Sequence, residues 1–223
     1  MSRTAPLDRL QELAHRQTIV SLGELRKHGI HHQIVRRALD RGLLTKIDRG
    51  WYLTSTDRPI FERRVLLACK RVPHGVVCLE SALRFHGVLD SNSEVIWMAI
   101  DRKARKPVVK GLRLHFVRFS GDALTQGVVN TRIDGIPVRV YSVAKTVADC
   151  FKYRNKIGLE IATRSFREGF RQRKCSRERV QHFARICRVS QILNSRLYQE
   201  LNSSLYANRN RQSTSANKVS LDI

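Results

Sequence analysis

The polar side chains of residues 31–41 have the types and the spacing of groups that read DNA. At about 100° per residue, a helix over this stretch would place one polar set in a single sector: Gln33, Arg36, Arg37 and Asp40. An apolar set falls roughly half a turn away: Ile34, Val35, Ala38 and Leu39. Arginine pairs bidentately with guanine or phosphate, and glutamine pairs with adenine. The stretch therefore favours a recognition helix over the alternative, an ordinary solvated arginine face.

Four residues around this helix could extend the contact. His31 and His32 lie at its first turn, where recognition helices usually meet base edges. Lys46 and Arg49 follow in a segment that could reach a phosphate or the minor groove. A metal pair is the less favoured interpretation of the two histidines, because adjacent helical residues diverge by about 100° and no Cys or His partner lies at ligand spacing.

A second set of residues could hydrolyse a phosphodiester. Asp101 ends an expected strand, Lys103 follows it, and Glu80 lies upstream on an expected helix. Two carboxylates and a lysine could hold Mg²⁺ and orient a water molecule. The favoured interpretation is an aspartate that caps its strand at the start of a basic loop. We therefore expect no catalytic site, no metal and no cofactor, and keep a metal-dependent DNA nuclease as the alternative.

Other reactive side chains are predicted to be structural. Ser81 or Cys78 could pair with His86 as a nucleophile, but no orienting acid lies in evident reach, and His86 more readily caps its helix. Asp149 is predicted to be a buried acid paired with an arginine. No C-x-x-C pair occurs, and three cysteines among apolar neighbours are expected to be buried thiols in a reducing compartment: Cys69, Cys78 and Cys150.

Three helices and a hairpin must position the N-terminal residues. Ser21 and Glu24 have capping-box spacing, so a helix should begin at Leu22. The full set of expected elements is helices over 7–15, 22–28 and 31–41, then strands over 43–47 and 51–54. This order is typical of a winged helix-turn-helix domain, predicted here over residues 1–56, with Lys46 and Arg49 on the wing. Trp51 and Tyr52 are expected to pack in the domain rather than stack on bases.

The sequence pattern after a polar linker predicts a mixed α/β domain over residues 61–206. Helices are expected over 61–71, 79–87, 142–152, 157–171, 176–187 and 190–206, and strands over 75–78, 94–101, 112–119, 128–133 and 136–141. An Asp-Gly pair predicts a hairpin between the last two strands. Residues 207–223 lack periodicity and are expected to be a disordered tail. The predicted fold class is α+β.

Positive charge runs through the whole chain. Lys and Arg number 42 against 19 Asp and Glu, giving +23, and this excess attracts polyanions. Residues 1–60, 61–153 and 154–223 carry +5, +8 and +10, so charge alone does not assign DNA contact to the N-terminal domain. An RNA-binding module using basic residues 154–188 is a further alternative, although RNA-binding signatures are missing. No apolar run of about 18 residues occurs, so we expect a cytoplasmic protein without a membrane partner.

Four segments together resemble the AbiEi-type antitoxins of abortive-infection, type IV toxin–antitoxin systems: "LLTKIDRGWYLTS", "CLESALRFHGV", "YSVAKTVADCFKY" and "GLEIATRSFREGF". The resemblance spans about residues 5–170. The matching positions are Arg49, Gly50, Tyr52, Ser81, Ala82, Leu83, His86, Gly87, Lys145, Thr146 and Asp149. These motifs look like scaffold signatures, so no catalytic role is carried onto them.

The resemblance implies two roles. One is repression of the protein's own operon through inverted repeats in double-stranded promoter DNA, which requires a dimer or successive monomers. The other is neutralisation of a nucleotidyltransferase-like toxin by the C-terminal domain, without a stable complex. A free-standing DNA-binding regulator of the same architecture is the alternative.

Overall fold

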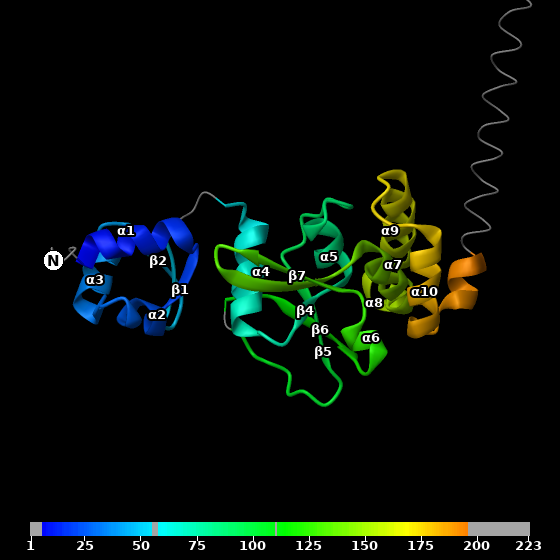
Figure 1. Ribbon diagram of the computed structural model, residues 1–223, viewed down its shortest axis with the longest axis horizontal. Helices are drawn as coiled ribbons and strands as arrows, with labels where there is room; N and C mark the ends of the chain where they lie inside the picture. Colours follow the sequence, from blue (N-terminus) through cyan, green and yellow to red (C-terminus); the bar gives the residue numbers. More distant parts are fainter. Residues whose placement is uncertain (1–5, 55–57, 110, 196–223) are drawn as a thin grey trace, which may run out of the picture.

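A computed structural model describes residues 6–54, 58–109 and 111–195 (Figure 1). The fold is mixed α and β. We call residues 6–54 the N-terminal unit and residues 58–195 the body. Figure 1 shows the N-terminal unit at one end of the molecule, a sheet in the middle and a group of helices at the other end. The tail predicted at 207–223 lies outside the described residues.

The N-terminal unit combines helices with a small antiparallel sheet. Its elements are α1 (Pro6–Arg16), β1 (Ile19–Ser21), α2 (Leu22–Lys27), α3 (His32–Asp40), β2 (Thr45–Asp48) and β3 (Trp51–Leu53). The strand order is β1-β3-β2. This arrangement is compatible with a winged helix-turn-helix. We call β2, β3 and their turn the N-terminal hairpin. The predicted helices are confirmed, whereas β1 was not predicted.

Local interactions explain where α2 begins and ends. The Ser21 hydroxyl accepts a hydrogen bond from the Glu24 amide at 3.2 Å, and the Glu24 carboxylate accepts one from the Ser21 amide at 2.7 Å. This capping box confirms the predicted start at Leu22. The turn after α2 passes through Gly29 at φ +70°, where a β-carbon would collide with the Arg9 guanidinium.

The body is built on a five-stranded mixed sheet of order β6-β5-β4-β8-β7. Its strands are β4 (Val76–Val77), β5 (Ile96–Asp101), β6 (Leu114–Phe119), β7 (Val128–Ile133) and β8 (Ile136–Tyr141). Strands β4 and β8 are parallel, as are β5 and β6, while β7 and β8 form an antiparallel hairpin. Asp134 and Gly135 turn that hairpin with φ +51° and +72°, so the predicted Asp-Gly turn is confirmed.

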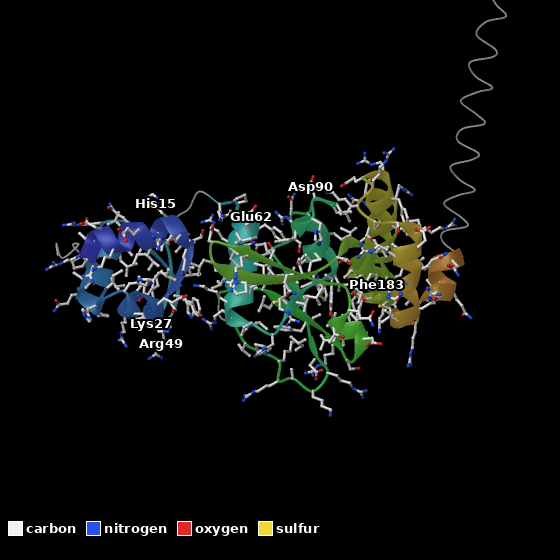
Figure 2. The ribbon with its side chains drawn as sticks, in the orientation of Figure 1. His15, Lys27, Arg49, Glu62, Asp90 and Phe183 are labelled. Carbon is white, nitrogen blue, oxygen red and sulfur yellow. The ribbon has the colours of Figure 1, made fainter. Side chains whose placement is uncertain are left out.

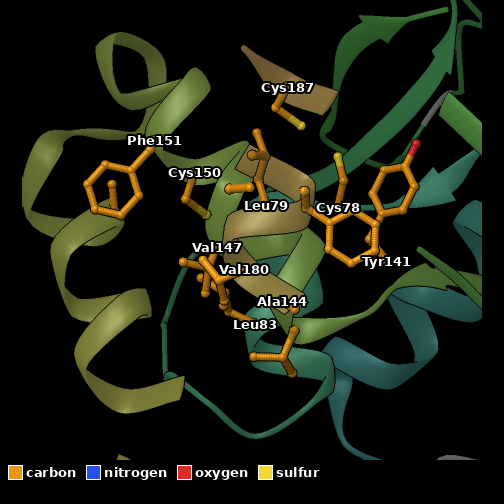
Figure 3. Packing of buried hydrophobic residues seen from close by; sticks show 14 of the residues in the cluster. Cys78, Leu79, Leu83, Tyr141, Ala144, Val147, Cys150, Phe151, Val180 and Cys187 are labelled. Carbon is orange, nitrogen blue, oxygen red and sulfur yellow. The ribbon is translucent and has the colours of Figure 1, made fainter. Parts of the chain in front are cut away.

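The described residues of the body also form seven named helices: α4 (Ile60–Arg71), α5 (Leu79–Phe85), α6 (Asp122–Thr125), α7 (Val143–Lys152), α8 (Arg154–Ile157), α9 (Leu159–Arg171) and α10 (Arg177–Cys187). Residues 190–195 are also helical, and the rest of the helix predicted over 190–206 lies outside the described residues. Helix α4 lies between the N-terminal unit and the sheet (Figure 1). Side chains from α5, α7 and α10 meet in one core (Figure 3).

One charged pair lies inside that core and corrects a prediction. Asp149 is fully buried, as expected, but its partner is Lys145 rather than an arginine. The Lys145 ammonium lies 2.6 Å from each Asp149 oxygen and sits over the rings of Phe119 and Tyr141 at 4.4 and 4.3 Å. Burial raises the pKa of Asp149, and Lys145 counters that rise. One turn of α7 brings the pair together, and Lys145 is the one cation among the buried polar side chains of the described residues.

Candidate nucleic-acid interface

The two faces of α3 separate as the sequence predicts. The exposed set is His31, His32, Gln33, Arg36, Arg37 and Asp40. Val35 and Ala38 are buried on the opposite side, and Ile34 and Leu39 are half-buried. Helix α3 lies at the end of the N-terminal unit farthest from the body (Figure 1). The polar face of α3 is therefore left uncovered by the other residues that the structure describes.

The apolar face of α3 fixes its position in the unit. Val35 and Ala38 pack in a core with residues of α1, β1, α2, β3 and the segments that flank α3: Leu10, Leu13, Val20, Leu25, Ile30, Leu44 and Tyr52. At the start of α3, the His31 carbonyl accepts hydrogen bonds from the Ile34 and Val35 amides at 2.9 and 3.1 Å. The His31 imidazole makes no capping bond and is exposed. Both histidines thus stand at the first turn, as predicted, while their contact with bases stays a prediction.

The N-terminal hairpin exposes the two cations assigned to it. Lys46 and Arg49 are both exposed, and a bulge lies between Lys46 and Asp48. The Asp48 carboxylate accepts a hydrogen bond from the Arg49 amide at 2.7 Å, and Gly50 completes the turn at φ +74°. Figure 2 shows Arg49 projecting on the same side of the unit as Lys27. The turn therefore presents positive charge beside α2.

The aromatic residues of the hairpin belong to the protein interior. Tyr52 is buried in the core of the N-terminal unit, and Trp51 is half-buried against residues of the body. Lys70 and Arg71 of α4 lie over the Trp51 ring at 5.7 and 5.5 Å from its centroid. The expectation that Trp51 and Tyr52 pack within the protein is confirmed.

The residues considered for catalysis have other partners. The Asp101 carboxylate accepts a hydrogen bond from the Lys103 amide at 2.7 Å and so caps the end of β5. Glu80 accepts a hydrogen bond from the Ser91 hydroxyl. In the part of the chain that the structure describes, no group of three or more His, Cys, Asp or Glu side chains could hold a metal ion. The geometry thus favours the structural interpretation of Glu80, Asp101 and Lys103.

Ser81 and His86 bind separate backbone groups rather than each other. The Ser81 hydroxyl accepts from the Trp97 amide at 2.9 Å, and His86 Nε2 donates to the Tyr141 carbonyl at 2.8 Å. Burial lowers the pKa of His86, which favours its neutral form. His86 is the C-cap of α5, as expected. The three cysteines predicted as buried thiols are indeed buried: Cys69, Cys78 and Cys150.

A second group of exposed cations lies on α9, α10 and the segments after them: Arg164, Arg167, Arg171, Arg173, Lys174, Arg177, Arg179, Arg185 and Arg188. Some of these cations already have partners in the protein. Arg171 bonds to Glu168 at 2.6 Å, and Lys174 donates to the Gly87 carbonyl at 2.9 Å. The sequence alone identified this region only as a basic segment. Which of its cations contact other protein groups depends on how the helices pack.

Comparisons with known proteins agree with the N-terminal resemblance. Residues 8–54 match the sequence model of a family described as "Transcriptional regulator, AbiEi antitoxin". The crystal structure of the RV2827C protein from Mycobacterium tuberculosis superposes with a TM-score of 0.55 at 16% identity, covering 82% of this chain and 72% of that one. At that identity the likeness concerns the fold alone. No curated protein matches the chain, and no described helix could cross a membrane.

Proposed function

We propose that this chain is a DNA-binding repressor of its own operon and an antitoxin to a nucleotidyltransferase-like toxin. Residues 8–54 match the model of the family described as "Transcriptional regulator, AbiEi antitoxin". The observation that carries the DNA-binding half is the geometry of α3. Its exposed face bears Gln33, Arg36 and Arg37, opposite buried Val35 and Ala38, at the end of the molecule away from the body.

In this proposal the N-terminal unit acts as a winged helix-turn-helix. Helix α3 enters the major groove, where Arg36 and Arg37 pair with guanine edges or phosphates and Gln33 pairs with adenine. His31 and His32 lie at the first turn, beside the bases. The N-terminal hairpin acts as the wing and brings Lys46 and Arg49 to a phosphate or the minor groove. No cofactor and no catalytic step is required.

Repression would follow from occupation of the promoter in the cytoplasm. Inverted repeats require two copies of α3, supplied by a dimer or by monomers that bind one after the other. The antitoxin half of the proposal assigns toxin neutralisation to the body, without a stable complex, and it rests on the family description and on the four-segment resemblance. A role in phage defence belongs to the same resemblance.

The DNA-binding half is tested with the double variant Arg36→Ala, Arg37→Ala. The target is a duplex selected from a random-sequence pool by the wild-type protein. We expect affinity to fall by roughly 100-fold, because each lost arginine contact costs about 1–3 kcal/mol. The slope of log K against log salt should flatten by about one for each phosphate contact removed. Thermal unfolding is the control and should not change, because both side chains are exposed. Unchanged affinity and slope would remove α3 as the reading element.

The antitoxin half needs a separate measurement. A nucleotidyltransferase-like protein encoded beside this chain is expressed alone and then together with the chain from an independent promoter. We expect growth arrest with the toxin alone and recovery with the pair. The Arg36→Ala, Arg37→Ala variant should still restore growth, because the proposal places neutralisation in the body. If neither the wild-type chain nor the variant restores growth, the chain is a regulator without an antitoxin role.

A further inference from the structure

The C-terminal end of α4 in the body reaches two separate elements of the N-terminal unit. Lys70 extends to the start of α2, where its ammonium lies 2.8 and 3.0 Å from the two oxygens of Glu24. It also donates to the Ile19 carbonyl at 2.6 Å and to the Gln17 side chain at 3.3 Å. Only 12% of the Lys70 side chain is exposed. This lysine therefore holds the carboxylate that forms the capping box of α2.

The neighbouring residue, Arg71, reaches the N-terminal hairpin. Its guanidinium lies 2.9 Å from the Asp48 carboxylate, and both side chains are largely buried, at 22% and 13% exposed. The same carboxylate accepts the Arg49 amide, so it joins Arg71 to the turn that presents Arg49. Lys70 and Arg71 also share the Trp51 ring between them. Two consecutive residues of the body thus hold α2 and the hairpin at once.

Apolar packing shields these contacts from water. Ile19 of β1 and Leu53 of β3 are buried in a core that they share with α4 residues such as Phe61 and Val65. Ion pairs beside such a core are screened less than exposed pairs, so they constrain geometry more strongly. The last turn of α4 also favours cations through the helix dipole. Burial raises the pKa of Glu24, but hydrogen bonds from Lys70 and Ser21 outweigh this and leave it below its usual range.

The hairpin is also tied to the helices of its own unit, because Tyr52 is buried in a core with residues of α1, α2 and α3. One backbone hydrogen bond, from the Leu22 amide to the Gly50 carbonyl at 2.8 Å, joins α2 to the turn. Strand β1 pairs with β3 over three residues, from Ile19 opposite Leu53 to Ser21 opposite Trp51. The contacts from the end of α4 add polar links to this packing, and they join the hairpin and α2 through a third element outside the unit.

We propose that Lys70 and Arg71 are positioning residues for DNA reading: they hold the N-terminal hairpin and α2 in the relative placement that lets the hairpin and α3 engage one duplex together. This inference rests on the proposed function. It makes the body part of the DNA-reading apparatus without requiring that the body touch DNA. It also gives a route by which an event in the body alters operator binding.

The test compares Lys70→Met, Arg71→Met with Arg64→Met in the full chain. Methionine keeps most of the apolar stem and removes the charge. Arg64 lies on the same helix and pairs with Glu94 of the body at 2.9 Å, so its loss removes an ion pair that does not involve the N-terminal unit. On the duplex selected by the wild type, we expect the double variant to bind about tenfold more weakly, within the usual range of coupling effects. Arg64→Met should bind like the wild type.

The salt dependence separates positioning from direct contact. Because Lys70 and Arg71 face the protein, their loss should leave the slope of log K against log salt unchanged. A flatter slope would mean that they contact phosphate themselves and would overturn the inference. The conservative variant Lys70→Arg, Arg71→Lys should recover most of the affinity. Equal weakening by Arg64→Met would also overturn it, because general destabilisation of α4 would then explain the loss.

A milder variant covers the case in which the double variant does not fold. Glu24→Gln keeps an acceptor for the capping box and removes the charge opposite Lys70. It should weaken binding in the same direction, with the salt slope again unchanged. This inference would be overturned if Glu24→Gln and every folded variant of Lys70 and Arg71 bound DNA with wild-type affinity. If Arg36→Ala, Arg37→Ala still bound weakly in the same assay, the proposed function would stand.

Discussion

Helices α3 and α9 have similar patterns and different surroundings. Both are amphipathic, and both present arginines on the exposed face. Helix α3 follows a capped helix, precedes a hairpin and lies at the free end of the N-terminal unit. Helix α9 packs on α7 within the helical end of the body, and its Arg171 is bonded to Glu168 on the same helix. Under the proposed function, the position of an arginine face in the fold, rather than its charge, distinguishes α3 from α9.

The largest effect should come from the buried face of α9. Phe166 is buried and packs against the rings of Phe151 and Phe170, with centroids 6.3 and 4.6 Å away. Phe166→Ala should lower the free energy of unfolding by about 3–5 kcal/mol, measured by urea denaturation. The folded fraction should bind DNA as the wild type does. Weaker binding by fully folded protein would show that α9 takes part in DNA contact and would break the comparison.

An intermediate effect is expected from the N-terminal hairpin. Lys46→Ala, Arg49→Ala should weaken DNA binding by roughly tenfold, because the proposal brings both side chains to a phosphate or the minor groove. The salt slope should flatten by about one for each of the two that contacts a phosphate. The loss should be similar on all duplex sequences, whereas Arg36→Ala, Arg37→Ala should change which sequences are preferred. Binding to a panel of point-mutated duplexes measures this difference. A sequence-dependent loss would move base reading from α3 to the hairpin.

The smallest effect should come from the exposed face of α9. Arg164→Ala, Arg167→Ala removes the same charge from an exposed helix face as Arg36→Ala, Arg37→Ala does. We expect less than a twofold change in DNA affinity and an unchanged salt slope, since general charge contributes only when it lies near the phosphates. Filter binding across a salt series checks this. A loss as large as that of the α3 variant would assign a second polyanion surface to the C-terminal helices, and competition with RNA would then identify its ligand.

Features set by neighbouring residues could be predicted from the sequence. The start of α2 depends on side chains three residues apart, and the two faces of α3 depend on helical periodicity. The turn between β7 and β8 depends on one Asp-Gly pair. In each case the determining atoms lie within a few positions of one another, so the sequence pattern states the interaction directly.

Features set by distant residues could not be predicted. Strand β1 has only three residues, too few for periodicity, and it forms because Trp51, Tyr52 and Leu53 pair with it. The contacts of Lys70 with Glu24 and of Arg71 with Asp48 join residues 46 and 23 positions apart. The partner of Asp149 was mispredicted for a different reason. Lys145 lies four residues away, within the reach of sequence reasoning, but an arginine was expected instead. The DNA contacts of α3 and of the hairpin stay predictions.

The burial of Ile19 and Leu53 limits how the N-terminal unit could recombine with other chains during evolution. Both lie inside the segment that matches the regulator family, yet both complete a core whose other fully buried members come from the body. If the N-terminal unit were grafted onto an unrelated chain, these two side chains would be exposed to water. Recombination should therefore succeed only between chains that offer an apolar helix like α4.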